Sequence, residues 1–234
     1  MWLLVALQLR QLAVKSKNCH CMIFNMTTIV LPLLAYLIGS LSFAIITSKL
    51  FGLPDPRSFG SKNPGATNVL RTGKKLAAAL TLLGDAAKGW VAVALAQHFS
   101  ASYGYGDYVI AAVALAVFIG HIYPIFFSFY GGKGVATALG ILLALNPWMG
   151  LGVFGTWLLA TYMWRVSSLS ALIAAGLAPL FALTLFGFTV YTGTVLILSL
   201  LLFWRHQSNI KNLLAGKEGG IGKGAGRPGD MPPE

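Results

Sequence analysis

The chain has 234 residues, of which 56% are hydrophobic and only 10% charged, and 17 basic residues against six acidic ones give a formal net charge of +11. Soluble domains carry roughly 25% charged residues, so this composition excludes an ordinary soluble globule and indicates an integral membrane protein. The basic residues lie in short clusters between apolar runs, which favours the positive-inside pattern of a membrane protein over a nucleic-acid-binding surface.

The first 25 residues do not match the rest of this pattern. They combine a short apolar stretch, residues 3–14, with three basic residues. If the first span begins on the outer side of the membrane, these basic residues lie on the outer side as well. A cleavable signal peptide places its basic residues before its apolar stretch, whereas two of these follow it. We therefore interpret residues 1–25 as an N-terminal extension produced by an over-long gene start, with Met26 as the working start. The three basic residues are Arg10, Lys15 and Lys17.

Seven apolar runs follow. They cover residues 29–50, 76–97, 108–128, 134–146, 148–164, 168–187 and 189–204. A helix needs about 20 residues, with a tolerated range of roughly 17–25, to cross the hydrocarbon core, so the fourth run is short and the last slightly short. Asn146-Pro147 separates the fourth run from the fifth, because Asn-Pro favours a turn and the residue before proline avoids helix.

The distribution of charge selects the number of spans. Seven spans that start outside leave 13 of the 14 basic residues after Met26 at or near the inner face, and the other one, Lys88, lies within a span. A six-span arrangement fuses residues 134–164 and puts Arg165 and the basic tail outside. The five-span alternative also fuses residues 168–204, which makes one very long span. We expect an all-α integral membrane protein with about seven transmembrane helices, five as the alternative, an outside N-terminus and cytoplasmic motif loops.

The first of those loops, residues 57–71, is rich in glycine, hydroxyl, amide and basic side chains. Glycine lets backbone N–H groups approach a ligand and form an anion-binding nest. Pro64 precedes a run that can open a short helix, and Arg71 can bind a phosphate through two parallel hydrogen bonds. The alternative is a turn-rich interfacial loop whose cations meet anionic lipid.

Three ionisable residues fall within the second and third runs. Asp85 and Lys88 are three residues apart inside the second run, where ionisable groups are costly, so we expect them to pair. We favour a structural role for the pair, holding helices together, over a role in orienting the site. His121 lies near the inner end of the third run, where we expect it to cap the helix rather than line a pocket.

The second motif, residues 131–137, places three glycines around Lys133 at the start of an apolar helix. This is again the composition of a phosphate cradle. It is not a Walker A loop, because Ser128 replaces the leading glycine and Gly134 replaces the Ser or Thr after the lysine, so ATP hydrolysis is not expected. The alternative is a flexible hinge whose lysine reaches toward the membrane surface.

The third motif follows the last run. His206 and Asn209 share a face if this stretch is helical. A histidine can act as a base near neutral pH, and an asparagine can donate to a developing oxyanion. The alternative is an interfacial histidine that caps the last span. Beyond Glu218, residues 219–234 are rich in Gly and Pro and are predicted to form a disordered cytoplasmic tail, which leaves residues 26–218 as a single transmembrane domain.

Two phosphate-type loops beside apolar helices indicate an enzyme that acts on lipid phosphates. A phosphate-ester transporter is the main alternative, but it would need polar residues at the middle of the membrane, where only Asp85 and Lys88 qualify. A membrane scaffold would not need glycine-rich anion cradles beside a His–Asn pair. No His in the chain is followed by Asp five positions later, which argues against the His–Asp mechanism of CoA-dependent acyltransferases.

At these motifs the chain resembles the PlsY family of acyl-phosphate:glycerol-3-phosphate acyltransferases, from about Met26 to Glu218. The resemblance is carried by residues 39–42, 60–71, 85–89, 131–137 and 206–218. It implies a seven-helix enzyme of the bacterial inner membrane with a cytoplasmic active site. The implied reaction transfers a fatty acyl group from acyl phosphate to the 1-hydroxyl of glycerol 3-phosphate. Lysophosphatidic acid and phosphate are the products, in the first step of phospholipid synthesis.

The resemblance also implies roles for individual residues. His206, Asn209 and Arg71 are expected to be catalytic, and Glu218 structural, like Asp85 and Lys88. The expected substrate and phosphate ligands are Ser61, Asn63, Gly65, Thr67, Asn68, Gly131, Gly132, Lys133 and Gly134. No cofactor, metal or nucleic acid is expected to bind. Membrane lipid is an expected partner, and so is a functional link to the enzyme that makes acyl phosphate. Two positions depart from the family: Lys62 stands where glycine is usual, and Asn212 where arginine is frequent.

Overall fold

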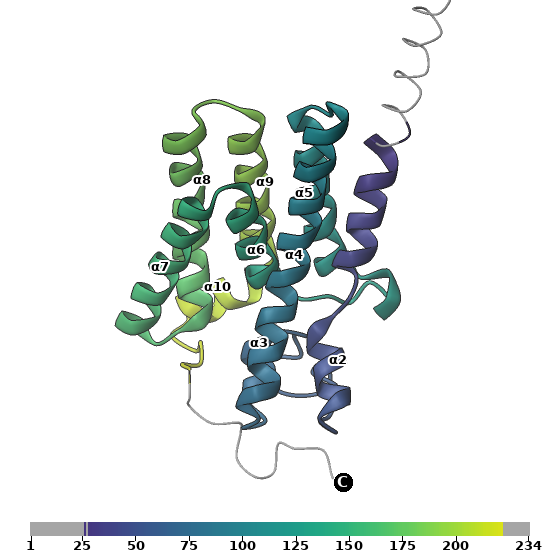
Figure 1. Ribbon diagram of the computed structural model, residues 1–234. Coiled ribbons are helices and arrows are strands. Elements are labelled where there is room, and N and C mark those ends of the chain that lie inside the picture. Colours follow the sequence, from purple (N-terminus) through teal and green to yellow (C-terminus); the bar gives the residue numbers. More distant parts are fainter. Residues whose placement is uncertain (1–25, 27, 222–234) are drawn as a thin grey trace, which may run out of the picture.

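The computed structural model of the chain describes Met26 and residues 28–221, and within this part all regular secondary structure is helical (Figure 1). The interpretation of residues 1–25 as an extension, and most of the predicted tail, fall outside the described residues. A first helix covers residues 28–39. The remaining helices are α2 (Phe43–Leu50), α3 (Ala66–Leu70), α4 (Lys75–Tyr103), α5 (Asp107–Ile122), the 3-10 turn η1 (Ile125–Phe127), α6 (Val135–Leu145), α7 (Pro147–Trp164), α8 (Ser167–Phe186), α9 (Val190–Arg205) and α10 (Gln207–Leu214).

The helices match the predicted apolar runs closely. The last four runs correspond to α6, α7, α8 and α9, with ends that differ from the prediction by at most one residue. Among the described residues, four helical stretches are long and apolar enough to cross a membrane, while α6 and α9 are shorter apolar helices. The four long stretches are Thr28–Leu50, Lys75–Tyr103, Asp107–Phe127 and Ser167–Phe186. Large apolar side chains cover much of the outer surface, as expected of helices that face lipid.

The predicted break at Asn146-Pro147 is confirmed. Asn146 caps the N-terminus of α7, and its side-chain oxygen accepts hydrogen bonds from the backbone N–H groups of Trp148 (2.9 Å) and Met149 (3.1 Å). Pro147 occupies the first turn, where its missing N–H costs nothing. Residues 134–164 therefore form two separate helices. Residues 168–204, which the five-span alternative also fuses, are likewise two helices, because α8 ends at Phe186 and α9 begins at Val190.

The first apolar run differs from the prediction, because it is interrupted rather than continuous. Residues 40–42 leave the helical conformation between the first helix and α2. The break frees the carbonyl of Leu41, which accepts a hydrogen bond of 2.6 Å from the ammonium group of Lys88. A buried lysine on a neighbouring helix thus compensates for the lost helical hydrogen bond.

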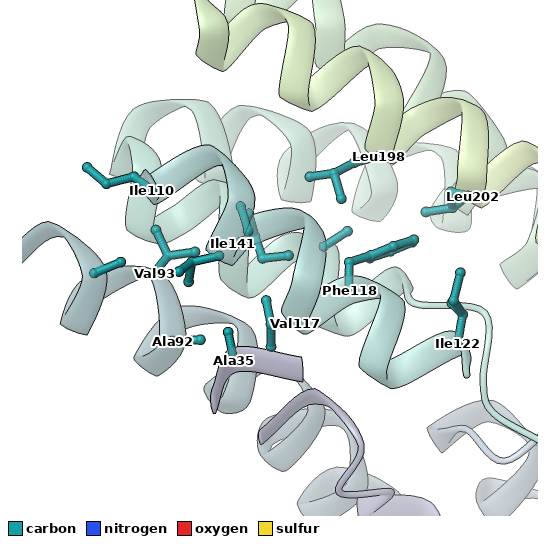
Figure 2. Close-up of a cluster of buried hydrophobic side chains, with 14 of the residues drawn as sticks. Ala35, Ala92, Val93, Ile110, Val117, Phe118, Ile122, Ile141, Leu198 and Leu202 are labelled. Carbon is teal, nitrogen blue, oxygen red and sulfur yellow. The ribbon is translucent and has the colours of Figure 1, made fainter. Parts of the chain in front are cut away.

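The core lies between α4, α5, α6 and α9 (Figure 2). Phe118 and Val117 of α5 are fully buried there, and Leu198 and Leu202 reach the same cluster from α9. Glycines allow α4 and α6 to approach closely, since a Cβ atom on Gly140 would collide with the backbone of Ala86. This packing fixes the start of α6, and with it the glycine-rich second motif, beside α4 and α5.

Candidate active site

Two cavities share lining residues at the end of the bundle where the three motifs meet. One, of about 430 Å³, runs between α4, α6, α7, α8 and α9 and has mainly apolar walls; we call it the apolar cavity. The other, of about 640 Å³, is lined by loops and by α10; we call it the polar cavity. The residues that line both are Ser61, Asn63, Arg71, Lys133, Asn209, Glu218 and Gly219.

The polar cavity is strongly cationic. Five basic side chains line it and one carboxylate, that of Glu218, opposes them. The basic residues are Lys62, Arg71, Lys133, Arg205 and Lys217. Such an excess of positive charge in a concave site attracts a phosphate dianion and can hold it through charge-assisted hydrogen bonds.

The glycine-rich motif forms a loop that ends at α6. Gly134 adopts a left-handed conformation (φ 88°) at the N-terminus of α6, and a Cβ atom there would meet the ring of Phe118, so only glycine fits. Arg205 holds the loop from the other side, because its guanidinium donates to the carbonyl oxygens of Gly131 (2.9 Å) and Gly132 (3.2 Å). These contacts turn the carbonyls of the first two glycines toward Arg205 and present Lys133 to both cavities.

Lys133 is partly buried in this loop. Burial lowers the pKa of its ammonium group to about 8, with Arg205 and Arg71 lowering it further and Glu218 opposing them. The group is therefore still mainly charged at neutral pH but loses its charge in mildly alkaline solution.

The first motif is a loop organised around Asn68. The amide of Asn68 donates to the carbonyls of Pro56 (2.7 Å) and Phe59 (3.2 Å) and accepts from the backbone N–H of Ser61 (3.0 Å). Asn68 lines the apolar cavity, while its hydrogen bonds hold the loop in place. The short helix expected after Pro64 is present as α3.

The other predicted residues of this motif are distributed between the two cavities. Ser61, Asn63 and Arg71 line both, while Gly65 and Thr67 line only the apolar one. The hydroxyl of Thr67 lies 3.3 Å from that of Ser167, at the start of α8.

His206 lies between α9 and α10 and is only 2% exposed. Its Nδ1 atom lies 2.8 Å from the carbonyl oxygen of Leu202, so Nδ1 carries the proton and Nε2 keeps its lone pair for the cavity that the residue lines. Burial is the main cause that lowers the pKa of this imidazole to about 4. The side chain is therefore a neutral hydrogen-bond acceptor at physiological pH.

Asn209 lies three residues further along, in α10, and His206 occupies the N-cap position of this helix. Its amide nitrogen donates to the carboxylate of Glu218 (2.6 Å), which also accepts from the hydroxyl of Ser168 (2.6 Å). Because a carboxylate can only accept, the Asn209 carbonyl must face away from it, and that oxygen is buried with no hydrogen-bond partner. One amide hydrogen and one acceptor remain for a ligand.

The predicted pair of Asp85 and Lys88 is confirmed, with 2.9 Å between the carboxylate and the ammonium group. The prediction that His121 only caps its helix is wrong. His121 occupies the last turn of α5 facing α4, lines the apolar cavity with Asp85, and places its Nδ1 atom 3.6 Å from that carboxylate. Its backbone carbonyl also accepts a hydrogen bond from the N–H of Gly132 (3.2 Å), which joins this cluster to the glycine-rich loop.

Several residues that surround the site were not singled out from the sequence. They are Arg205, Lys217, Ser167, Ser168 and residues 219–221. The last three were assigned to the disordered tail, but they line the apolar cavity, and the N–H of Ile221 donates to the carbonyl of Arg165 (2.7 Å) in the turn between α7 and α8. The glycine-rich composition of residues 219–221 does not indicate this contact with the turn between α7 and α8. The position of Arg205 directly before His206, by contrast, could have indicated that Arg205 lies near the site.

The chemistry available is that of anions and hydrogen bonds. Within residues 28–221 no cluster of three or more His, Cys, Asp or Glu side chains is arranged to hold a metal ion. The site instead combines a cationic pocket, a neutral imidazole acceptor and an amide donor at the mouth of an apolar cavity.

Comparison with known proteins gives consistent matches over most of the chain. A family model described as glycerol-3-phosphate acyltransferase matches residues 29–216. Curated glycerol-3-phosphate acyltransferases from Nitrosospira multiformis and Nitrosomonas eutropha are 59% and 61% identical over 198 residues, which is 85% of this chain and 98% and 99% of theirs.

The fold also has solved counterparts. A crystal structure of PlsY, an integral membrane glycerol 3-phosphate acyltransferase in its glycerol 3-phosphate form, is similar with a TM-score of 0.78 and 37% identity, over 83% of this chain and 96% of that one. The lysophosphatidic acid form is similar with a TM-score of 0.76 and 36% identity, over 83% and 95% of the two chains.

Proposed function

The chain belongs to the glycerol-3-phosphate acyltransferase (PlsY) family, an integral membrane family that acylates glycerol 3-phosphate in phospholipid synthesis, and we propose that its acyl donor is an acyl phosphate. The products are then lysophosphatidic acid and inorganic phosphate, and a separate enzyme must supply the donor.

One observation carries this proposal: a cationic cavity and an apolar cavity share seven lining residues. The polar cavity suits the phosphate of glycerol 3-phosphate, with Lys133 and Arg71 as its principal partners. The apolar cavity suits the fatty chain of the donor. Their shared boundary is where the phosphate of an acyl phosphate would lie, beside the same two cations.

The reaction follows from this placement. The 1-hydroxyl oxygen of glycerol 3-phosphate attacks the acyl carbonyl carbon and forms a new C–O bond. The bond between that carbon and the phosphate oxygen then breaks, and its electron pair leaves with the phosphate. The donor is already activated, so no covalent enzyme intermediate is needed. Lys133 and Arg71 stabilise the charge on the departing phosphate.

His206 and Asn209 complete the site. An effective general base has a pKa near the working pH, and the pKa of His206, at about 4, is too low for that role. We assign His206 the task of orienting the attacking hydroxyl through Nε2, while the proton leaves with the phosphate. The amide hydrogen of Asn209 that Glu218 leaves free is directed to the oxyanion of the tetrahedral intermediate.

The same arrangement favours a defined orientation in the bacterial inner membrane. We propose seven crossings with the N-terminus outside, which places the two cavities on the cytoplasmic side, where glycerol 3-phosphate is available. The shared boundary residues all come from loops and helix ends at one end of the bundle. α6 and α9 are the shorter apolar helices, and one end of each, Val135 and Arg205, lies next to residues that line the cavities.

The decisive test uses purified protein in detergent with labelled glycerol 3-phosphate and palmitoyl phosphate. The proposal predicts lysophosphatidic acid and phosphate in equal amounts. In sealed vesicles without donor it predicts no uptake of the label. Uptake without acylation would instead establish a transporter and overturn the proposed reaction.

The role of His206 has its own test. Substitution His206→Ala should lower kcat by about 10²-fold or more, the usual effect of losing a catalytic hydrogen bond, without introducing or removing a step in the pH profile near 6.5. A step near pH 6.5 in the native enzyme that the variant lacks would show that His206 takes the proton.

A further inference from the structure

The apolar cavity ends inside the bundle at a common depth on three helices. Its innermost lining residues are Ala178 on α8, Val195 on α9 and Val153 on α7. Each lies about 11 residues from the end of its helix at the active site, which corresponds to about 16 Å at the helical rise of roughly 1.5 Å per residue. Three helices that contribute their last lining residue at the same level define a floor.

The floor is closed by residues packed behind it. Met149 and Ala182 are 0% exposed and belong to the same buried cluster as the three floor residues, but they do not line the cavity. Interiors are close-packed, so a chain that reaches this level can proceed only by displacing a side chain.

The wall that α8 forms between the active site and the floor carries mainly small side chains. α8 presents alanines to the cavity at positions 171, 174, 175 and 178, the spacing of a single helical face. Alanine is the smallest side chain with a Cβ atom, so this face leaves room for a flexible chain along the helix. Of the bulkier lining residues of α7, Trp157 lies nearer to the active site than the floor does, and Phe154 lies at the level of the floor.

We propose that the floor made by Ala178, Val153 and Val195, backed by Met149, measures the length of the acyl chain that the enzyme transfers. This inference rests on the proposed function. An extended backbone advances roughly 3.6 Å for three bonds, or about 1.2 Å per bond, so 16 Å accommodates about 13 bonds. Acyl chains of about 14 to 16 carbons fill the cavity with the carbonyl at His206.

The first variant raises the floor. Ala178→Leu adds volume at the deepest point of the cavity, so the ratio of kcat/KM for the palmitoyl donor to that for the lauroyl donor should fall at least about tenfold, because each excluded methylene loses its burial. The matched control is Leu177→Ala, which changes a side chain at the same depth that is 39% exposed on the outer surface. The control should leave the ratio unchanged.

The second variant lowers the floor. Met149→Ala opens space behind Val153, so the ratio of kcat/KM for the stearoyl donor to that for the myristoyl donor should rise several-fold. This variant also keeps the proposal open to refutation if Ala178→Leu fails to fold.

A binding measurement separates this inference from the identity of the donor. Thermal stabilisation by lysophosphatidic acids, from lauroyl to stearoyl, reports on the chain cavity even if acyl phosphate proves not to be the donor. Shifts in the preferred length in opposite directions for the two variants are expected. The proposal would be overturned if both folded variants kept the chain-length preference of the native enzyme, or if a variant lost kcat/KM equally for all chain lengths.

Discussion

At the scale of single residues, Lys62 combines an unfavourable backbone with a useful charge. It adopts a left-handed conformation (φ 55°), which costs a residue with a Cβ atom roughly 1–2 kcal/mol relative to glycine. Glycine, which the resemblance implies at this position, would adopt this φ without strain. The lysine nevertheless lines the polar cavity, so we interpret the cost as tolerated for an additional cation that attracts an anionic substrate.

Replacing Lys62 by glycine should therefore separate stability from affinity. We expect Lys62→Gly to raise the Tm slightly or leave it unchanged, while KM for glycerol 3-phosphate rises about three- to tenfold and becomes less sensitive to salt. Lys62→Asn is the matched control, because asparagine tolerates the left-handed conformation but carries no charge, and it should raise KM equally. An unchanged KM in both variants would show that Lys62 does not act on the substrate.

Lys133 gives the site a predicted alkaline limit. Its folded-state pKa is lowered to about 8, so kcat/KM for glycerol 3-phosphate should fall as the pH rises through about 8 and the ammonium group loses its charge. In Lys133→Arg the cation persists to much higher pH, so the fall near pH 8 should disappear even if the plateau is lower. The same alkaline fall in both enzymes would assign it to another group.

At the scale of the elements, the site depends on how closely α6 approaches α4. The sequence predicted α6 and α7 as separate helices from Asn146-Pro147, because that signal is local. The contact of Gly140 with the backbone of Ala86 is not local, and a glycine in an apolar run gives no indication of which helix it faces. This contact sets the position of the loop that carries Lys133.

The element-scale prediction compares two glycines. Gly140→Ala should lower the Tm by several degrees and reduce activity, because the added Cβ must push α6 away from α4. Gly155→Ala, where a Cβ would meet nothing within 4 Å, should leave both unchanged or raise the Tm slightly through its higher helix propensity. Equal effects at the two positions, measured by thermal unfolding in detergent, would refute the proposed role of the α4–α6 contact.

At the scale of the whole molecule, the apolar pattern predicted most helices, and the charge pattern predicts which of their ends face the cytoplasm. The sequence also indicated the three motifs, each of which contributes residues to the cavities. It did not indicate that His121 faces Asp85, or that Ile221 crosses to Arg165, because both contacts depend on how distant helices are arranged. Local composition predicts which residues belong to a site more readily than it predicts which distant residues they contact.

The proposed orientation can be measured with single cysteines in a chain whose Cys19 and Cys21 are replaced by serine. Phe188 lies between α8 and α9 and is 96% exposed, whereas Leu214 ends α10 and is 86% exposed. We expect Phe188→Cys to react with a membrane-impermeant maleimide in intact cells, and Leu214→Cys to react only after permeabilisation. The reverse pattern would place the site on the other face.

The central claim is that the enzyme transfers an acyl group from acyl phosphate to glycerol 3-phosphate at the boundary between the two cavities. The most direct measurement gives purified enzyme glycerol 3-phosphate with either palmitoyl phosphate or palmitoyl-CoA and follows lysophosphatidic acid. We predict product from palmitoyl phosphate alone, with one phosphate released for each acyl group transferred. Product from palmitoyl-CoA alone would contradict the proposed donor, and no product from either with folded protein would contradict the assignment of this site as the place of acyl transfer.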